Sequence, residues 1–150
     1  MEPNKDFEEF FELLNKHKVR FVVVGGYAVI FHGYPRFTGD IDLFYEAEAG
    51  NVEALLDALK EFGFNFPELT VPELTKEGQV VQLGQPPNRI DLINQISGVK
   101  FTDVWQKKVA GTYGKESAFY IDLENLMRNK RAASRSKDQQ DIDFFRKKED

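Results

Sequence analysis

The 150-residue sequence predicts an α/β fold, in which a small mixed β-sheet is flanked by helices and the C-terminus is helical. Two observations predict this fold. Short runs of β-branched and aromatic residues, typical of strands, alternate along the chain with segments whose apolar residues recur at helical spacing. The length is that of one domain over residues 1–150, enough to bury a core, and no repeat or linker divides it.

The first third of the chain predicts two helices and two strands in alternation. The expected elements are a helix over 6–17, a strand over 19–24, a helix over 27–32 and a strand over 40–45. Asn4 or Asp6 is the expected N-cap of the first helix. Gly25 and Gly26 end the first strand, and Pro35 is expected to end the second helix. The segment therefore predicts a strand, a glycine turn and a helix in direct succession.

The remainder of the chain predicts a crossover helix, a hairpin and a helical end. A helix is expected over 51–61, with Asn51 as its N-cap and Gly63 just past its end. The stretch 65–76 contains two prolines and predicts an irregular loop over the site. The further expected elements are a hairpin of strands 79–83 and 89–96, a short helix around Trp105, a strand pair within 111–121, and helices from Leu123 onward.

Composition excludes several classes of chemistry and of location. The chain has no cysteine and two histidines, so disulfides, thiol chemistry and cysteine-based zinc sites are excluded, and a metal would be held by oxygen. The net charge of -5 argues against a long nonspecific nucleic-acid footprint. No apolar run approaches the ~20 residues that a membrane span needs, and the acidic start lacks the pattern of a signal peptide. These features predict a cytoplasmic protein without a membrane partner.

The most informative pattern is the pair of aspartates Asp40 and Asp42. Residues i and i+2 of a strand project to the same face, so the two carboxylates are expected to lie side by side, while Ile41 and Leu43 fill the opposite face. Two neighbouring anions repel each other unless a cation lies between them. A hard divalent ion such as Mg²⁺, which takes oxygen ligands, is the natural occupant.

A third aspartate, Asp91, is expected on the later strand. Two interpretations are open there: it joins the other two acids, or it pairs with Arg89, which shares its face of the strand, or with a surface lysine. Gly25 and Gly26 likewise fit either a plain strand-ending turn or a close backbone approach to a ligand.

Taken together, these segments resemble the nucleotidyltransferase fold of the DNA polymerase beta superfamily. The resemblance rests on residues 22–26 (VVVGG), 38–43 (TGDIDL), 89–93 (RIDLI) and 137–142 (KDQQDI), and it covers roughly residues 19–145. Within the superfamily, the size and the C-terminal pattern are most similar to small stand-alone bacterial and archaeal nucleotidyltransferases, some of which are toxins of toxin–antitoxin pairs. The resemblance implies transfer of a nucleoside monophosphate from a nucleoside triphosphate to a hydroxyl acceptor, which could be tRNA, a protein or a small molecule. An antitoxin or a second copy of the chain is an open choice of partner.

This chemistry assigns roles to the acids and the glycines. Nucleotidyl transfer needs concentrated positive charge at phosphorus, which two Mg²⁺ ions, or Mn²⁺ in their place, can supply. Asp40 and Asp42 are expected to bridge the two ions, and Asp91 to hold the ion on the attacking side and accept the hydroxyl proton. Gly25 and Gly26 are expected to let backbone N–H groups approach the triphosphate.

Four further residues are candidates for phosphate or acceptor contacts. The resemblance places Thr38 at the phosphates, and their positive charge suggests Arg36, Lys130 and Lys137. The cation-rich stretch 128–137 fits either a solvated helix face or a stripe of arginines at positions 128, 131 and 135 that meets an RNA acceptor.

Two other functions remain open at this stage. The first is a catalytically silent protein of the same fold that binds a nucleotide or a partner chain. The second is a phosphohydrolase that uses the same metals with water as the nucleophile. Release of pyrophosphate or of inorganic phosphate would separate these functions from nucleotidyl transfer.

Overall fold

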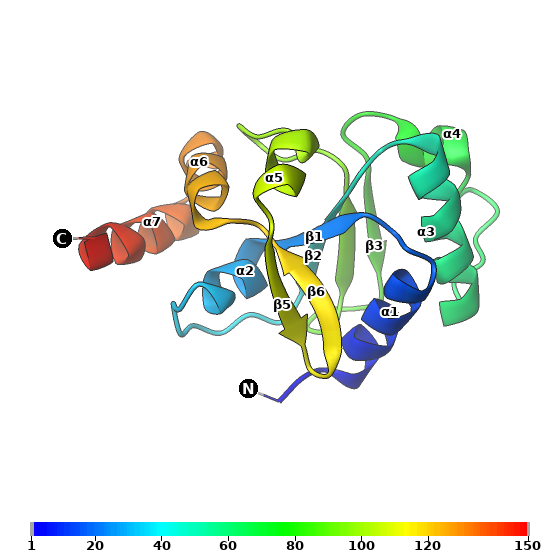
Figure 1. Cartoon of the computed structure of the whole chain (residues 1–150), viewed down its shortest axis with the longest axis horizontal. Coiled ribbons are helices and arrows are strands. Elements are labelled where there is room, and N and C mark those ends of the chain that lie inside the picture. Colours follow the sequence, from blue (N-terminus) through cyan, green and yellow to red (C-terminus); the bar gives the residue numbers. More distant parts are fainter. Residues whose placement is uncertain (1, 150) are drawn as a thin grey trace.

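The structure, a computed structural model, describes residues 2–149 and is built on one six-stranded mixed sheet with helices on both sides (Figure 1). In chain order the elements are α1 (Lys5–Lys16), β1 (Phe21–Val24), α2 (Gly25–Phe31), β2 (Ile41–Tyr45), α3 (Ala49–Phe62), α4 (Val71–Thr75), β3 (Val80–Leu83), β4 (Ile90–Ile93), α5 (Phe101–Lys107), β5 (Val109–Tyr113), β6 (Glu116–Tyr120), α6 (Leu123–Ala133) and α7 (Ser136–Glu149). The predicted α/β class is confirmed. Within the described residues, no helix is long and apolar enough to cross a bilayer.

The sheet has the strand order β3-β4-β2-β1-β6-β5. The central strand β1 runs antiparallel to β2 and parallel to β6, while β2 and β4 are parallel to each other. All four residues of β1 are buried, which matches the continuous apolar run that predicted this strand. The predicted hairpin is confirmed as the antiparallel pair β3–β4, and the second predicted pair as β5–β6.

Helices α1, α3 and α4 lie together on one side of the molecule, and α6 and α7 on the other (Figure 1). Helix α1 is capped by Asn4, whose side chain accepts hydrogen bonds from the backbone N–H groups of Asp6 and Phe7. Its apolar stripe, Phe7, Phe10, Phe11 and Leu14, is 1% exposed at each position. Burial of each such side chain contributes roughly 1.5–3 kcal/mol to the free energy of unfolding, so this helix is a principal part of the core.

Two predictions for α2 and α3 are corrected by the structure. Helix α2 ends at Phe31, before Pro35 is reached, and Gly33 there has φ +109. Helix α3 begins two residues earlier than expected, and its N-cap is Glu48 rather than Asn51. Asn51 instead turns its side chain onto the backbone of Arg20, accepting from its N–H at 2.7 Å and donating to its carbonyl at 3.0 Å. A buried amide that joins the chain before β1 to α3 therefore outweighed the local capping preference.

The stretch 65–76, predicted to be an irregular loop over the site, contains the short helix α4. Thr70 caps it by accepting from the backbone N–H of Glu73 at 3.3 Å, and Pro72 is tolerated because it lies in the first turn. Leu74 is fully buried, and its carbonyl accepts from the Tyr45 hydroxyl at 2.8 Å. Helix α4 thus packs beside α3 and does not cover the site.

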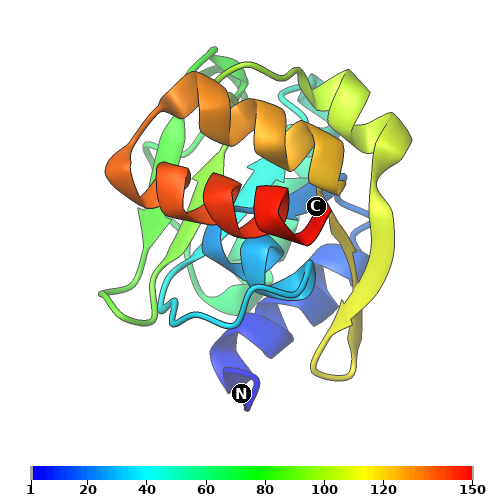
Figure 2. The same cartoon turned by 90° about the vertical axis from the view of Figure 1, so that its left-hand side faces the viewer.

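The C-terminal helical segment is broken once, at Ser134, which adopts φ 55 and ends α6. Figure 2 shows α6 and α7 as two helices that lie across the same end of the molecule. The break means that Arg135 does not continue the helix that carries Arg128 and Arg131. The predicted stripe of three arginines on one helix is therefore wrong, and Arg135 belongs to a different surface.

Candidate nucleotide and metal site

The acids on β2 and β4 meet because of the register between these two parallel strands. Asp42 pairs directly with Asp91, and Val24 of β1 pairs with Asp42 on its other side. Side chains of directly paired residues project to the same face of a sheet, so the two carboxylates are direct neighbours. Burial, and then the charge of Asp91 and a hydrogen bond with it, raise the pKa of the Asp42 carboxyl to about 6. Asp42 therefore holds its proton more tightly than an exposed carboxyl, because it is buried and lies beside a second carboxylate.

This pKa predicts how the stability of the metal-free protein depends on pH. Because the native Asp42 carboxyl, with its pKa of about 6, holds its proton more tightly than an ordinary carboxyl of pKa 3.8, stability is complete below pH 3.8 and falls as the pH rises through about 6. Relative to the Asp42→Asn variant, the wild type is expected to lose about 3 kcal/mol of unfolding free energy between about pH 3 and about pH 7. Urea unfolding of both proteins across this range measures the difference. A difference that does not change with pH would contradict the assignment.

Arg89 lies between Asp40 and Asp91. Its Nε donates to Asp91 Oδ1 at 2.7 Å and its Nη2 to Asp91 Oδ2 at 3.1 Å, while Nη2 also lies 3.3 Å from Asp40 Oδ2. The sequence left open whether Asp91 pairs with Arg89 or joins the other acids. The structure shows both, because Asp91 contacts Arg89 and also lies beside Asp42. In the part of the chain that the structure describes, no three His, Asp or Glu side chains are arranged to hold one ion. The carboxylates of Asp40 and Asp91 instead both contact the guanidinium of Arg89.

Gly25 and Gly26 bring the backbone of the first turn of α2 against this acidic edge. Gly25 has φ +68, which disfavours a side chain, and a Cβ there would collide with the carboxylate of Asp42. A Cβ on Gly26 would lie 2.5 Å from the hydroxyl oxygen of Thr38. The two glycines are therefore required for the close approach of this turn to Asp42 and to Thr38. Their approach to a bound triphosphate stays a prediction.

The structure brings most of the predicted site residues around one pocket of about 340 Å³. Its walls are Gly26, Arg36, Thr38, Gly39, Asp40, Asp42, Arg89, Asp91, Arg135 and Lys137. Gly25 lines an adjoining pocket of about 410 Å³, which shares Asp42 and Arg135 with the first. The cations of the first pocket outnumber its acids by one, so an anionic ligand beside a cation would be accommodated electrostatically.

Sequence reasoning missed two arginines of this pocket and misplaced one lysine. Arg89 was considered only as an alternative partner of Asp91, although its position two residues before that acid on the same strand face was a usable signal. Arg135 was assigned to a helix stripe. Lys130 lies in the core between α6 and α7, 3% exposed, and does not line the pocket. Its predicted contact with phosphate therefore has no geometric support.

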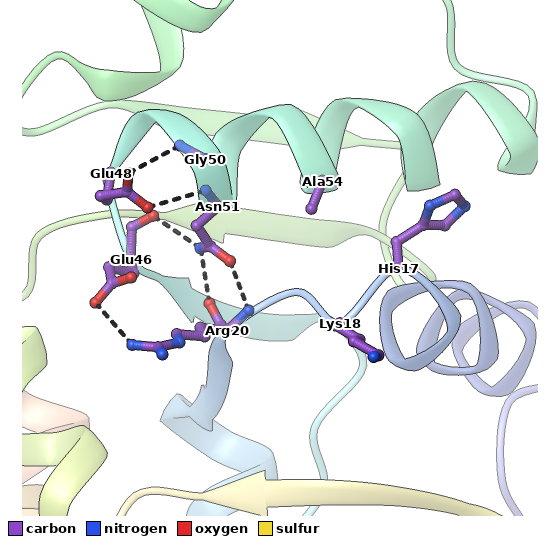
Figure 3. Close-up of a pocket in the computed structure, with 8 residues that line it drawn as sticks. All are labelled: His17, Lys18, Arg20, Glu46, Glu48, Gly50, Asn51 and Ala54. Carbon is purple, nitrogen blue, oxygen red and sulfur yellow. Dashed lines mark hydrogen bonds and ion pairs between the residues drawn. The ribbon is translucent and has the colours of Figure 1, made fainter.

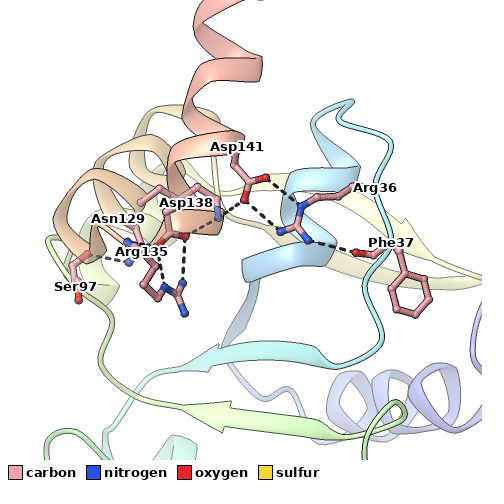
Figure 4. A network of polar contacts seen from close by, with 8 residues as sticks. Arg36, Phe37, Ser97, Asn129, Arg135, Asp138 and Asp141 are labelled. Carbon is pink, nitrogen blue, oxygen red and sulfur yellow. Dashed lines mark hydrogen bonds and ion pairs between the residues drawn. The ribbon is translucent and has the colours of Figure 1, made fainter.

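A buried network of charges explains the position of Lys130 and holds two of the pocket arginines (Figure 4). The ammonium of Lys130 lies 2.8 Å from Asp141 Oδ2 and 3.3 Å from Asp138 Oδ1, and both acids are almost completely buried. Asp141 also accepts from Arg36 Nη2 at 3.2 Å, and Asp138 from Arg135 Nε at 2.7 Å. The two acids of the C-terminal pattern therefore anchor cations whose other side faces the pocket.

A second, larger hollow of about 570 Å³ lies by the start of α3 and shares no residue with the acidic pocket (Figure 3). Most of the charged side chains that line this hollow form ion pairs or hydrogen bonds with neighbouring groups. Glu46 lies 3.8 Å from the guanidinium of Arg20, and Glu48 accepts from the backbone N–H groups of Gly50 and Asn51. This hollow is accounted for by the capping of α3 and its attachment to the chain before β1.

The mixed sheet, with Gly-Gly at the end of β1 and aspartates at the starts of β2 and β4, defines a protein of the nucleotidyltransferase fold. A crystal structure of a protein from Thermotoga maritima, provisionally named a nucleotidyltransferase, shares this fold with a TM-score of 0.58 and 16% sequence identity over 95% of this chain and 89% of that chain. The family described as nucleotidyltransferases of unknown function (DUF6036) matches residues 5–144, and the chain belongs to this family. No curated protein matches the chain in sequence.

Proposed function

We propose that the protein transfers a nucleoside monophosphate from a nucleoside triphosphate to a hydroxyl acceptor, with divalent cations held by Asp40, Asp42 and Asp91. One observation carries the proposal: the register that pairs Asp42 with Asp91 sets two carboxylates together inside a pocket that is otherwise rich in cations. Carboxylate oxygens are the donors that Mg²⁺ and Mn²⁺ prefer, and burial together with the neighbouring charge of Asp91 raises the pKa of Asp42, which a bound cation would lower again. The chemistry of the donors therefore fits such an ion, which would have to replace Arg89 as the partner of Asp40 and Asp91.

In the proposed reaction, different residues of the pocket would have different roles. Asp40, Asp42 and Asp91 would hold Mg²⁺ or Mn²⁺, which supplies Lewis-acid stabilisation of the charge that develops on the phosphate oxygens. Gly26 and Thr38 offer backbone and hydroxyl groups at the pocket wall, and with the neighbouring cations they would orient the triphosphate. Asp91 would accept the proton of the attacking hydroxyl.

Calorimetric titration of nucleoside triphosphates tests the first half of this function. The triphosphates are expected to bind to the wild-type protein in the presence of Mg²⁺, and at least about tenfold more weakly when EDTA replaces the metal, because the cation neutralises both the acids and the phosphates. The Lys137→Met variant, which removes a cation from the pocket wall, is expected to bind the Mg²⁺ complex more weakly than the wild type. Binding that is absent or independent of metal would refute the proposal.

One observation favours a second candidate, a catalytically silent nucleotide-binding or partner-binding protein of the same fold. Arg89 already pairs with both Asp40 and Asp91, so these two acids share a counter-ion in the absence of a divalent cation. This function would be indicated by tight nucleotide binding without release of pyrophosphate in the presence of any acceptor pool.

The identity of the acceptor is also a proposal. So is a partner chain, either an antitoxin or a second copy of this chain. The acceptors to test are tRNA, protein side chains and small-molecule hydroxyls. Incubation with labelled triphosphates and total cell RNA or protein would show which fraction acquires the label.

A further inference from the structure

Arg89 differs from the other arginines of the pocket in the acids that it contacts. Arg36 and Arg135 are held by Asp141 and Asp138, which are buried behind the pocket wall. The guanidinium of Arg89, by contrast, forms its two parallel hydrogen bonds with Asp91 and its ion pair with Asp40. Among the pocket arginines that the structure describes, it is therefore the one whose anions are also the candidate ligands of a metal.

The backbone register imposes this arrangement. Ile41 pairs with Ile90, so Asp40 and Arg89 are the next residues back along the same parallel ladder. The N–H of Ile41 donates to the carbonyl of Arg89 at 3.0 Å, and the N–H of Arg89 donates to Asp40 Oδ1 at 3.2 Å. Arg89 and Asp91, two residues apart, project to the same face as their partners on β2. The cation is thus supplied by the strand that supplies the third acid.

On the basis of the proposed function, we propose that Arg89 is a built-in counter-ion that competes with divalent cations for Asp40 and Asp91 and moves onto the triphosphate when cation and nucleotide bind together. The bidentate pair must open before the two acids can turn toward a metal, which weakens the binding of free cations. A triphosphate in the same pocket offers the displaced guanidinium new anionic partners. Cation and nucleotide are therefore expected to bind with positive coupling.

The side chain has room for such a movement. Arg89 is 24% exposed and lines the pocket directly, unlike the fully buried Lys130. The same pocket is also lined by Arg36, Arg135 and Lys137, so an anion there would lie among several cations. Arg89 can leave Asp40 and Asp91 for such an anion without leaving the pocket. The buried anchors Asp141 and Asp138 keep Arg36 and Arg135 in place meanwhile.

Binding of Mn²⁺, followed by the electron paramagnetic resonance signal of the free ion, tests this proposal without requiring turnover. The wild type is compared with Arg89→Gln, with Arg89→Lys, and with Arg20→Gln as a matched control. Arg20 contacts Glu46 at 3.8 Å outside the pocket, so its replacement removes the same charge elsewhere. Circular dichroism verifies that each variant is folded.

Without nucleotide, Arg89→Gln is expected to bind Mn²⁺ about tenfold more tightly than the wild type, since the competing guanidinium is gone. Arg89→Lys, which keeps the charge but cannot form the two-pronged pair, is expected to lie between them, and Arg20→Gln to match the wild type within about twofold. A non-hydrolysable triphosphate should increase the affinity for Mn²⁺ more in the wild type than in Arg89→Gln.

Equal affinities in the wild type and Arg89→Gln, or an equal gain in Arg20→Gln, would overturn the role of Arg89 and leave the proposed function intact. If neither protein bound Mn²⁺ even with the triphosphate analogue present, the proposed function would fail as well. The two failures are therefore distinguishable in one series of titrations.

Discussion

The Asp42→Asn variant is expected to lose nucleotidyl transfer almost completely, by about 10³-fold in turnover, which corresponds to about 4 kcal/mol of transition-state stabilisation. Asp42 is the central acid of the site: it is paired in register with Asp91, its carboxylate packs against Gly25, and it borders both adjoining pockets. An amide cannot supply the negative charge that holds a divalent cation. Release of labelled pyrophosphate in the presence of an acceptor measures the effect.

The fold of this variant is expected to survive, because replacing the carboxylate also removes its repulsion from Asp91. The thermal midpoint at neutral pH should therefore equal or exceed that of the wild type. Asp57→Asn is the matched control, since Asp57 is exposed on α3 and outside the pocket, and its turnover should stay within about twofold of the wild type. Wild-type turnover in Asp42→Asn would refute the role assigned to this acid.

The Lys130→Met variant is expected to lose about 3–5 kcal/mol of unfolding free energy, because it leaves two buried carboxylates without their shared cation. The ammonium of Lys130 lies within 3.3 Å of both Asp138 and Asp141, and all three side chains are at most 4% exposed. Methionine keeps the approximate length of the side chain, so the loss reports mainly on charge. Urea unfolding at neutral pH measures it.

Lys107→Met is the matched control for this variant. Lys107 also forms an ion pair, at 3.1 Å from Glu124, but both side chains are more than half exposed. Such a surface pair contributes at most about 1 kcal/mol. Similar losses in the two variants would show that the network around Lys130 does not stabilise the fold in the way that its burial indicates.

Local patterns predicted most of the secondary structure because the physical signals were local. The helix predicted over 6–17 and the strand predicted over 19–24 appear in the structure as α1 and β1. The failures occurred where a tertiary contact outweighed a local preference. Asn51 joins two backbone segments instead of capping α3, and Leu74 is buried within a stretch that its prolines marked as irregular.

In the candidate site, too, local patterns were easier to predict than long-range contacts. The spacing of Asp40 and Asp42 and the preceding glycines indicated an acidic edge beside a close backbone turn, since the two-residue period of a strand and the absence of a Cβ are properties of the chain itself. The cation-rich stretch 128–137, which spans the end of α6 and the start of α7, was harder to interpret. The sequence alone does not distinguish Lys130 from Lys137. In the structure Lys130 is buried among acids, whereas Lys137 lines the pocket.

By itself, the amino-acid sequence therefore determined the α/β class, the two-acid strand and the glycine turn, because each depends on periodicity or on backbone freedom over a few residues. The tertiary structure alone decided that Asp91 lies beside Asp42, that Arg89 is interposed between Asp40 and Asp91, and which cations face the pocket. These relations depend on the register between strands far apart in the chain and on the burial of α7 against α6. A one-residue shift in that register would turn Asp91 to the opposite face of the sheet.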